Sequence, residues 1–595
     1  MSVRIPNPQT KTLRQLNTSD LLGDIWSSCN LNLTENLGRI RVSNRGLNVG
    51  SIGTSLVPIV FQYYDGDSNS RIWCIAGTRM YYNSGAGGQS WVQDATASTP
   101  TNLGVDCDME LFNNALYICG NGDIRKYNGA WSTVSTAPNG GPCSMCVFGG
   151  RLYFTQSQSQ IGSMSIGEVV VEPTSTPNTQ INTLDLADFG SGATGANTIM
   201  SIRASSNRIW IATIDASSVS TLGRSGKIFE WDGVNPQANK VYYLDSIGAM
   251  ALIIKGDIPY AVDANGRLLQ FNGREFVEIA RLPIPPQYYL IYPNPFSSRW
   301  IYPRGISIRN NRILLLVGNN DSFSYNTSAP FMESLPTGIW EYDENIGLYH
   351  RYSPSLWQTG VTVTRSDYSH VGITQPGAIY NVKPQTSPNT NGDLMWGQAI
   401  WNGSTYIGTS FFNDVDDTIS KMGYFVTTKI DSQNIEDRWL KVILKHKKFL
   451  SVNDKIVLKY RTDERASLYL NITWTSTTTF TNGDSNLSAF VIGDEIEILS
   501  GPGGGQIETI TSIVNNAGTY TVTLENAVTG ATGIARARAQ KWIVLGVAST
   551  QGVDHHEFPI GISSSWIQFK CIMYFTGNNE LNELELINST HLPSV

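Results

Sequence analysis

The stretch NRIWIA, residues 207–212, decides the fold, because the same kind of unit returns along the first two thirds of the chain. In each copy an Asn, Gly or Ser precedes a short run rich in apolar and aromatic residues. Such a run after a turn residue is typical of a strand that begins at a tight turn. The other copies are SRIWCI at 70–75, NALYIC at 114–119, GRLYF at 150–154, GDIPYA at 256–261 and NRILLL at 311–316.

Each unit stands within a longer repeat of short strands. The first residues of successive units lie 36 to 57 positions apart. A short apolar run precedes each unit, and several are followed by a third run that ends in an aromatic residue, then Asn or Asp, and usually Gly. Four short antiparallel strands in about 40–50 residues are typical of a β-propeller blade. Third runs occur as IRKYNG at 124–129, IFEWDG at 228–233, LLQFNG at 268–273 and IWEYD at 339–343.

This repeat predicts an all-β chain that contains a β-propeller of six or seven blades. Six units are clear, and a seventh is predicted around Asp393–Phe412. One blade cannot bury both of its faces, so neighbouring blades stack around an axis, and closure of the ring protects their edges. An all-β sandwich with coincidental spacing is the alternative interpretation.

The pattern changes after Tyr424, where longer alternating runs begin. The runs at Arg438–His446 and Lys455–Arg461 predict a hairpin with one apolar face and one basic face. Strong strands near the end of the chain complete a predicted β-sandwich. The predicted parts are residues 1–50, an N-terminal assembly segment; 51–420, the β-propeller; 421–471 with 541–595, the C-terminal β-sandwich; and 472–540, an inserted small β-domain.

The composition excludes several classes of protein. The chain has 595 residues, of which 42 are basic and 49 acidic, so its formal net charge is −7. Without an excess of Lys and Arg, the chain is not expected to coat nucleic acid, and its content of apolar and aromatic residues is too high for disorder. We expect no membrane-spanning helix, because no run of about 18 apolar residues occurs. We expect no signal peptide, because the first residues lack an apolar core.

Motifs for metal chemistry are sparse. Cys143 and Cys146 form a lone C-x-x-C, and the other five cysteines are expected to be buried thiols of a protein made in a reducing compartment. Adjacent histidines such as His555 and His556 point to opposite faces of a strand and chelate poorly. The acidic loop Asp414–Asp417 lacks the full spacing of a calcium loop. We therefore predict no metal site and no cofactor.

Enzymatic activity is not expected either. The stretch SGAGGQSW at 84–91 is similar to the Asp-box turn of sialidases, S-x-D-x-G-x-S-W, but Ala86 stands where that motif has Asp. The loop GPGGG at 501–505 enters a strand, which favours a tight turn over a phosphate-binding loop. Asp263 and Glu341 are candidate carboxylates for a glycosidase, but nothing in the sequence singles them out.

Basic residues near the two ends of the chain are the candidate assembly contacts. Residues 1–50 alternate arginines with apolar residues, which suits a strand added to the sheet of a neighbouring subunit. A propeller-closing strand within the same chain is the alternative. The lysines of the C-terminal hairpin form either a solvated face or a docking surface for an acidic partner. The candidate residues are Arg39, Arg41, Arg45, Lys441, Lys445 and Lys447.

The whole arrangement resembles a tail protein of tailed bacteriophages, of the nozzle or tail-tube-B type found in short-tailed phages. The resemblance rests on the early strand at 32–45, on the divergent repeat with its Tyr-Asn-Gly and Trp-Asp-Gly turns, and on the runs around Arg438–Val442 and Ile456–Arg461. It implies a structural virion protein of the tail, assembled in the host cytoplasm. It also implies a homo-hexameric ring below the portal and adaptor, contacts with tail fibre or spike proteins, and a channel that passes viral DNA during ejection.

Two other classes of function stay open from the sequence. A receptor-binding tail adhesin would carry sugar pockets lined by Trp and Tyr, and it would form trimers or stay monomeric. A sialidase-like enzyme or another propeller glycoside hydrolase would act as a monomer with convergent carboxylates. The net charge of −7 agrees with a DNA channel, because a strongly basic wall would retard the phosphates.

Overall fold

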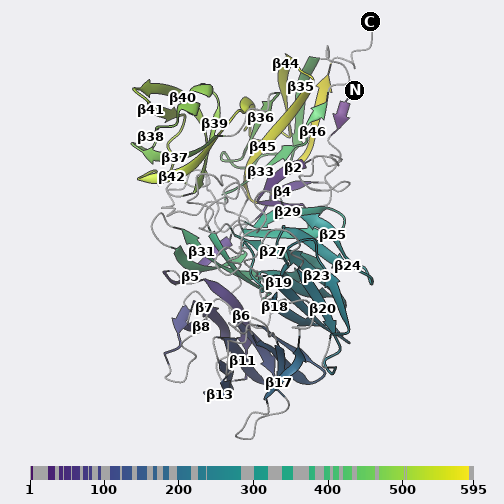
Figure 1. Ribbon diagram of the computed structural model, residues 1–595. Coiled ribbons are helices and arrows are strands. Elements are labelled where there is room, and N and C mark those ends of the chain that lie inside the picture. Colours follow the sequence, from purple (N-terminus) through teal and green to yellow (C-terminus); the bar gives the residue numbers. More distant parts are fainter. Residues whose placement is uncertain are drawn as a thin grey trace.

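The computed structural model shows a chain built almost entirely of strands (Figure 1). The helix among its described residues is the short 3-10 helix η4 (Ser485–Ala489), and no described helix has the length and apolar character to cross a membrane. The prediction of an all-β chain is confirmed. The described residues are 2–4, 25–33, 39–43, 46–54, 57–66, 71–77, 79–83, 91–95, 107–120, 123–136, 144–156, 165–169, 179–185, 197–215, 226–235, 238–282, 300–318, 338–352, 374–381, 394–401, 406–413, 420–431, 438–462, 468–500, 503 and 506–588.

Seven antiparallel sheets of four strands each occupy the described parts of residues 46–413. The first contains β6 (Pro58–Tyr64), β7 (Arg71–Ala76), β8 (Arg79–Asn83) and β9 (Trp91–Gln93). The second contains β10 (Asp108–Phe112), β11 (Ala115–Gly120), β12 (Asp123–Tyr127) and β13 (Trp131–Thr136). The third contains β14 (Met145–Phe148), β15 (Arg151–Gln156), β16 (Ser165–Val169) and β17 (Thr179–Asp185).

The remaining four sheets repeat the same up-and-down order. The fourth contains β18 (Asn197–Ala204), β19 (Ile209–Asp215), β20 (Lys227–Trp231) and β21 (Lys240–Tyr243). The fifth contains β22 (Ala249–Lys255), β23 (Ile258–Asp263), β24 (Arg267–Phe271) and β25 (Phe276–Arg281). The sixth contains β26 (Ile306–Arg309), β27 (Arg312–Val317), β28 (Gly338–Asp343) and β29 (Gly347–Tyr352). The seventh contains β30 (Thr374–Asn381), β31 (Leu394–Trp401), β32 (Tyr406–Asn413) and β5 (Gly46–Thr54).

These seven sheets form a closed, propeller-like ring in the lower part of Figure 1. The first strands of neighbouring sheets contact one another in order from β6 through β10, β14, β18, β22, β26 and β30, and β30 contacts β6 again. The predicted unit around Asp393–Phe412 supplies β31 and β32 of the seventh sheet. That sheet is completed from the other end of the ring, because β5 pairs with β32.

The turn residues that define the sequence repeat lie at equivalent places. Asn114, Asn207 and Asn311 each stand between the first and second strands of their sheet. A two-residue hairpin of type I′ needs positive φ at both central residues, which Asn, Asp and Gly tolerate best. Both turn residues have positive φ at 113–114, 149–150, 256–257 and 310–311. This geometry accounts for the turn residue in four of the units, whereas Asn207 lies in the longer turn between Ala204 and Ile209.

Two six-stranded sheets pack face to face beyond the ring and form what we call the two-sheet domain (Figure 1). The β35 sheet contains β3 (Leu31–Asn32), β4 (Ile40–Val42), β46 (Glu580–Asn588), β35 (Arg438–His446) and β44 (His555–Ser563), with β1 (Ser2–Arg4) on β46. The β36 sheet contains β2 (Ile25–Cys29), β33 (Ser420–Thr427), β45 (Trp566–Thr576), β36 (Lys455–Arg461) and β43 (Ile543–Ala548), with β34 (Ile430–Asp431) on β45.

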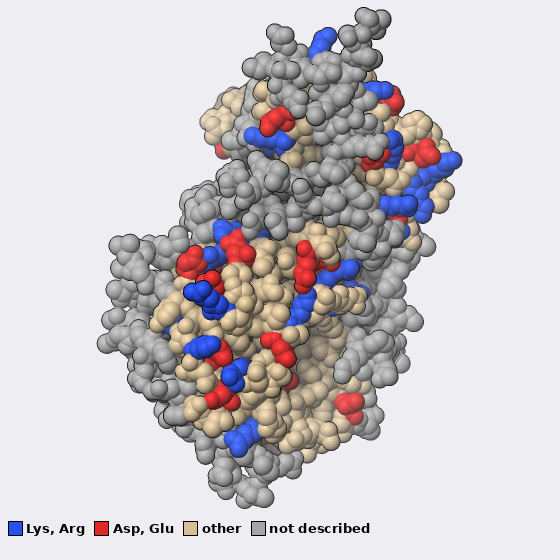
Figure 2. All heavy atoms as spheres, turned by 90° about the vertical axis from the view of Figure 1, so that its right-hand side faces the viewer, with Lys and Arg blue, Asp and Glu red and all other residues tan. Residues whose placement is uncertain are grey.

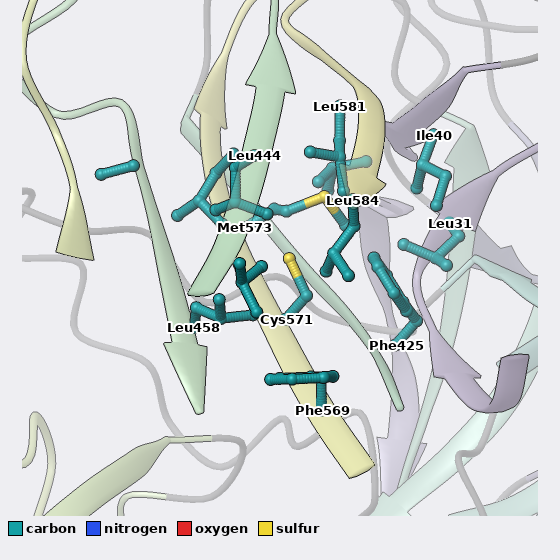
Figure 3. Packing of buried hydrophobic residues seen from close by; sticks show 14 of the residues in the cluster. Leu31, Ile40, Phe425, Leu444, Leu458, Phe569, Cys571, Met573, Leu581 and Leu584 are labelled. Atoms are coloured by element: carbon teal, nitrogen blue, oxygen red, sulfur yellow. The ribbon is translucent and has the colours of Figure 1, made fainter. Parts of the chain in front are cut away.

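A single hydrophobic core joins these two sheets. Leu444 and Leu584 come from the β35 sheet, and Leu458, Met573 and Phe425 come from the β36 sheet (Figure 3). All five are at most 3% exposed. Burial of a side chain of this size contributes about 1.5–3 kcal/mol, so this core fixes the two sheets against each other.

The two-sheet domain rests on the sixth sheet of the ring. Tyr349 of β29, and Ile346 just before that strand, belong to the core of the two-sheet domain. The backbone N–H of Asn30 donates a hydrogen bond of 2.8 Å to Nδ1 of His350. Nδ1 of His350 is therefore the unprotonated nitrogen, and this buried bond ties the N-terminal strands to the ring.

The predicted inserted domain is a closed six-stranded barrel that begins at Leu468. It has its own core, which includes Ile472, Phe480, Ile496 and Val522. Its order is β37 (Leu468–Trp474), β38 (Thr479–Asn482), β41 (Thr519–Leu524), β40 (Ile507–Asn516), β39 (Glu495–Ser500) and β42 (Ile534–Gln540), which pairs again with β37.

The described strands of residues 1–50, which the sequence predicts to be an assembly segment, pair within their own chain. β1 and β4 pair with β46, β3 pairs with β4, and β2 pairs with β33. β5 closes the seventh sheet. The alternation of Arg and apolar residues does suit strand addition, but the described strands add to sheets of their own chain, which is the intramolecular alternative. Any role in assembly stays a prediction.

Candidate functional site

Two of the predicted assembly arginines bind one buried glutamate of the same chain. Arg39 Nη1 donates to Glu580 Oε2 at 2.7 Å, and Arg41 Nε donates to Glu580 Oε1 at 2.5 Å. Glu580 is 1% exposed, so the two charges hold β4 and the residue before it against β46. Arg45 lies outside the described residues.

The three predicted lysines also have partners within the chain. Their contacts are Lys441 with Glu557 at 2.8 Å, Lys445 with Glu583 at 2.9 Å, and Lys447 with the carbonyl oxygen of Asn578 at 3.2 Å. Glutamates of β44 and β46 thus match the basic face predicted for the hairpin. Exposed pairs of this kind contribute about 0–1 kcal/mol, so the lysines stay available to a stronger acidic partner. For β46, the alternating glutamates of the last strand were the sequence pattern from which these lysine partners could have been predicted.

A cluster of charged side chains, which the sequence did not predict, lies at the centre of the ring. Arg304 Nε donates to Asp108 Oδ1 at 2.6 Å, and Arg304 Nη2 donates to Glu110 at 3.2 Å. Arg203 Nη1 lies 3.7 Å from Asp108 Oδ2. The three elements involved are β10, β18 and the loop before β26, which belong to the second, fourth and sixth sheets. Because these sheets are not neighbours, the cluster spans the ring axis.

Burial and the neighbouring charges together determine the electrostatics of this central cluster. Burial, together with the neighbouring Arg304, lowers the pKa of Arg203 to about 10. Burial also raises the pKa of Glu110, although Arg304 opposes the shift. Ser144 completes the cluster by donating to Asp108 Oδ2 at 3.2 Å. Two guanidinium groups and two carboxylates therefore balance each other, and the cluster fills the place where a propeller often has an open channel.

The other candidates for metal chemistry are not brought together in the described residues. Cys146 is buried, and burial raises the pKa of its thiol, so it stays protonated. Cys143 and the loop Asp414–Asp417 lie outside the described residues. No group of three metal-ligating side chains occurs in the part of the chain that the structure describes.

The candidate glycosidase carboxylates, Asp263 and Glu341, are bound by other side chains of the ring. Asp263 accepts hydrogen bonds from the N–H of Asn265 at 3.0 Å and from Arg267 Nε at 2.7 Å. Glu341 accepts from the hydroxyl of Tyr349 at 2.8 Å and lies 3.6 Å from Arg351 Nε. Both carboxylates are buried, and each is bound by residues of its own sheet, Asp263 in the fifth and Glu341 in the sixth.

A pair of histidines joins β35 to β44. His446 Nε2 and His556 Nδ1 are 3.0 Å apart, and His446 Nδ1 lies 2.8 Å from the carbonyl oxygen of Lys447. A carbonyl only accepts, so His446 carries its proton on Nδ1, and His556 donates to its bare Nε2. His555 points away and lies 3.3 Å from Asp554. The expectation that His555 and His556 face opposite ways agrees with these contacts.

A buried triad fastens the barrel to the two-sheet domain. Glu495 of β39 accepts from Lys459 of β36 at 2.7 Å and from Lys570 of β45 at 2.5 Å. All three side chains are at most 5% exposed. Burial alone would raise the pKa of Glu495, but the two ammonium groups outweigh it and hold that pKa below its usual value.

A cleft of about 1330 Å³ lies beside this triad, between the barrel and the β36 sheet. Its polar lining includes Glu508, which accepts from Asn526 at 2.9 Å and whose pKa is raised by burial. Lys455 also lines it and lies over the ring of Tyr574, 4.8 Å from the ring centroid. The rest of its lining mixes charged residues, such as Lys459, Arg461 and Lys541, with apolar ones. The exposed apolar residues are Val491 and Ile492 on the barrel, and Ile543, Val544 and Val547 on β43.

The charged side chains on the face of the molecule shown in Figure 2 are intermingled in sign. Pairs such as Lys255 with Glu344, and Arg281 with Glu278, are typical of the ring. A surface of this kind has no single-sign field that would steer a polyanion to it. The cleft likewise combines basic residues, such as Lys455 and Arg461, with the acidic Glu508 and Glu525.

Comparisons with known proteins find matches only among solved structures, and the three described next are all of low TM-score and low sequence identity. No family model matches the chain, and a search of curated proteins finds no match. A chain in the crystal structure of the mitotic checkpoint complex is 11% identical, with a TM-score of 0.34, covering 63% of this chain and 95% of that one. The WD40 β-propeller domain of Doa1 is 10% identical, with a TM-score of 0.31, covering 62% and 96%. The computationally designed protein Ika8 is 10% identical, with a TM-score of 0.32, covering 61% and 99%.

Proposed function

We propose that this chain is a structural protein of a bacteriophage tail, of the nozzle type that its sequence resembles. On this proposal the seven sheets of the ring are the blades of a seven-bladed β-propeller, and the two-sheet domain is a β-sandwich. The protein would act in the virion tail as a subunit of a homo-hexameric ring, below the portal and adaptor and in contact with fibre or spike proteins.

The observation that carries the proposal is the way in which the two ends of the chain are tied together. Strands before and after the ring lie side by side in the two-sheet domain, where Arg39 and Arg41 bind Glu580. β5 then closes the ring itself. A subunit built in this way resists separation of its parts, which suits a component that stays intact while DNA passes under pressure.

The central cluster decides where DNA would pass on this proposal. Asp108, Arg203 and Arg304 fill the centre of the ring, so a duplex has no path along the axis of one propeller. The channel of the nozzle would instead lie on the axis of the assembly, between subunits. Its wall would be nearly neutral or acidic, in agreement with the net charge of −7 per chain.

We also propose that the protein is not an enzyme. Asp263 and Glu341 are occupied by structural partners in different sheets. The stretch at 84–90, similar to an Asp-box, lies outside the described residues. Turnover of any member of a panel of glycosides and polysaccharides, abolished by one carboxylate substitution, would contradict this part of the proposal.

Mass photometry and negative-stain imaging of the purified protein test the assembly. We expect a six-fold ring, formed alone or on a portal complex, whereas a stable monomer or trimer would favour the enzyme or the adhesin. The double variant Lys441→Glu with Lys445→Glu is expected to abolish the ring at an unchanged melting temperature, because both lysines are partly exposed. Lys240→Glu, on the exposed strand β21, is the matched control and is expected to leave the ring intact.

A further inference from the structure

The cleft between the barrel and the β36 sheet carries charges of opposite sign on its two sides. The side formed by β36 is basic, because alternate residues of that strand point to the same face of the sheet. The side formed by the barrel is mainly acidic. The charged residues are Lys455, Lys459 and Arg461 on β36, and Asp494, Glu508 and Glu525 on the barrel. Charges arranged in this way suit a ligand that carries both signs.

Half of these charged groups are already fixed by other side chains of the chain. The contacts are Lys459 with Glu495 at 2.7 Å, Asp494 with Lys541 at the end of the barrel, and Arg461 with Gln568 at 2.7 Å. The other three form no ion pair among the described residues; they are Lys455, Glu508 and Glu525. One ammonium group on the β36 side and two carboxyl groups on the barrel side therefore remain for a ligand.

Tyr574 of β45 borders both kinds of group. The ammonium of Lys455 lies over its ring, 4.8 Å from the centroid, which is a cation–π contact. Burial raises the pKa of the Tyr574 hydroxyl, and the nearby Glu508 adds to that shift. A ligand that reaches both charges must therefore extend past the side chain of Tyr574.

The two carboxyl groups of the barrel lie close enough to affect each other. Glu508 is 7% exposed, and its Oε2 accepts a hydrogen bond of 2.9 Å from Asn526. Burial raises the pKa of Glu508, and the charge of Glu525 raises it further. A cation beside both carboxyl groups would relieve this repulsion. The barrel side of the cleft is therefore suited to an amine.

We infer that this cleft binds a small zwitterionic ligand, with its ammonium group at Glu508 and Glu525 and its carboxylate at Lys455. A single lysine is a point charge, which matches a monoanion. The middle of the ligand would pack on apolar side chains such as Val457 and Val544. A short peptide with free ends has this chemistry, because three extended residues separate its terminal charges by about 10 Å. This inference does not depend on the proposed function.

The volume of the cleft allows a ligand of this size. It is about 1330 Å³, whereas pockets for small ligands usually have about 300–1000 Å³. A tripeptide therefore fits with room for water, and the charges at the two sides have to select its orientation.

Calorimetric titration of the full chain with one tripeptide in three forms tests the inference. The probe is alanyl-leucyl-alanine with free ends, and its controls are the N-acetylated and the C-amidated forms, each of which lacks one charge. We expect saturable binding of the free form with a dissociation constant of about 1 mM. Each blocked form is expected to bind about tenfold more weakly, because one charged group then lacks its partner. No binding of the free form, or equal binding of either blocked form, would overturn the inference.

Protein variants locate the two charges of the peptide. Lys455→Met is expected to bind the free form as weakly as the unmodified chain binds the amidated form, and Glu525→Gln as weakly as it binds the acetylated form. The matched controls are Lys255→Met and Glu344→Gln, which belong to an ion pair of the ring and are expected to leave binding unchanged. Melting temperatures show whether each variant is folded. Full binding of the free form by folded Lys455→Met or folded Glu525→Gln would overturn the assignment to this cleft.

Discussion

The ring and the two-sheet domain are both antiparallel, but their strands come together in opposite ways. Six of the seven ring sheets join strands that are consecutive in the chain. In the two-sheet domain three pairings, β1 and β4 with β46 and β2 with β33, join strands from opposite ends of the chain, and the hydrogen bond from Arg41 to Glu580 spans 539 positions. Local hairpins need little loop closure, whereas distant pairs need the whole intervening chain in place. Six ring sheets can therefore form from local hairpins, whereas the three pairings with the N-terminal strands need both ends of the chain.

Deletion of residues 1–54 tests this comparison with the largest expected effect. It removes β1 to β4 from the two-sheet domain and β5 from the seventh sheet, and it uncovers the core around Leu31 and Ile40. We expect the cooperative unfolding transition to disappear in calorimetry and near-UV circular dichroism. Deletion of residues 1–24, which takes away β1 alone among the described strands, is the control and is expected to keep that transition. A 1–54 deletion that melts like the full chain and merely fails to assemble would contradict intramolecular closure.

The ring was predictable because its information is local. Residues 114, 207 and 311 all mark the turn between the first and second strands of a sheet. Four such turns, those at 113–114, 149–150, 256–257 and 310–311, have φ values that Asn, Asp and Gly adopt most readily. The aromatic-Asn/Asp-Gly signal likewise marks the turn to the fourth strand. Gly129, Gly233 and Gly273 all have positive φ there. Chemistry that repeats at each turn leaves a pattern that one sequence can show.

The site and the N-terminal pairing were not predictable, because they depend on partners far away in the chain. Nothing near Arg39 or Arg41 points to Glu580, and nothing near Asp108 points to Arg203 or Arg304. A lysine in an alternating run is normally taken as solvated, yet Lys459 is buried because β39 supplies Glu495. The cleft exists only where the barrel stands against the β36 sheet.

A single buried residue, Glu495, tests how the barrel is held against the two-sheet domain. Glu495→Gln leaves Lys459 and Lys570 buried without their shared carboxylate, and loss of one partner of a buried ion pair costs about 3–5 kcal/mol. We expect a decrease of that size in the free energy of unfolding, or separate unfolding of the barrel, measured by denaturant titration. Glu583→Gln breaks a partly exposed pair with Lys445 and is expected to cost under about 1 kcal/mol. Equal effects would mean that the triad does not hold the barrel.

The hairpin turns of the ring provide a smaller and more local test. Asn311 has φ +63°, so Asn311→Ala strains the backbone and is expected to lower the free energy of unfolding by about 1–2 kcal/mol. Asn311→Gly relieves that strain and is expected to be nearly neutral. Asn207 stands at the equivalent turn but is not among the residues with positive φ, so Asn207→Ala is the matched control. A similar loss at both positions would show that the side chains, and not the turn geometry, select Asn.

The smallest expected effect is a pH dependence confined to the two-sheet domain. Burial lowers the pKa of both His446 and His556, and His555 lowers each of them further, while Asp554 and the carbonyl of Lys447 oppose the shift at His446. A folded-state pKa below the unfolded value of about 6.5 means that the unfolded chain binds more protons, so this stabilisation is complete above about pH 6.5 and decreases as the pH falls. We expect His446→Gln to shrink the difference in melting temperature between pH 7.5 and pH 5.5 by about one or two degrees, the equivalent of a few tenths of a kcal/mol. The control is Lys445→Gln, one residue away on β35, which is expected to leave the difference in melting temperature unchanged. An unchanged difference in His446→Gln as well would show that the histidine pair does not titrate with folding.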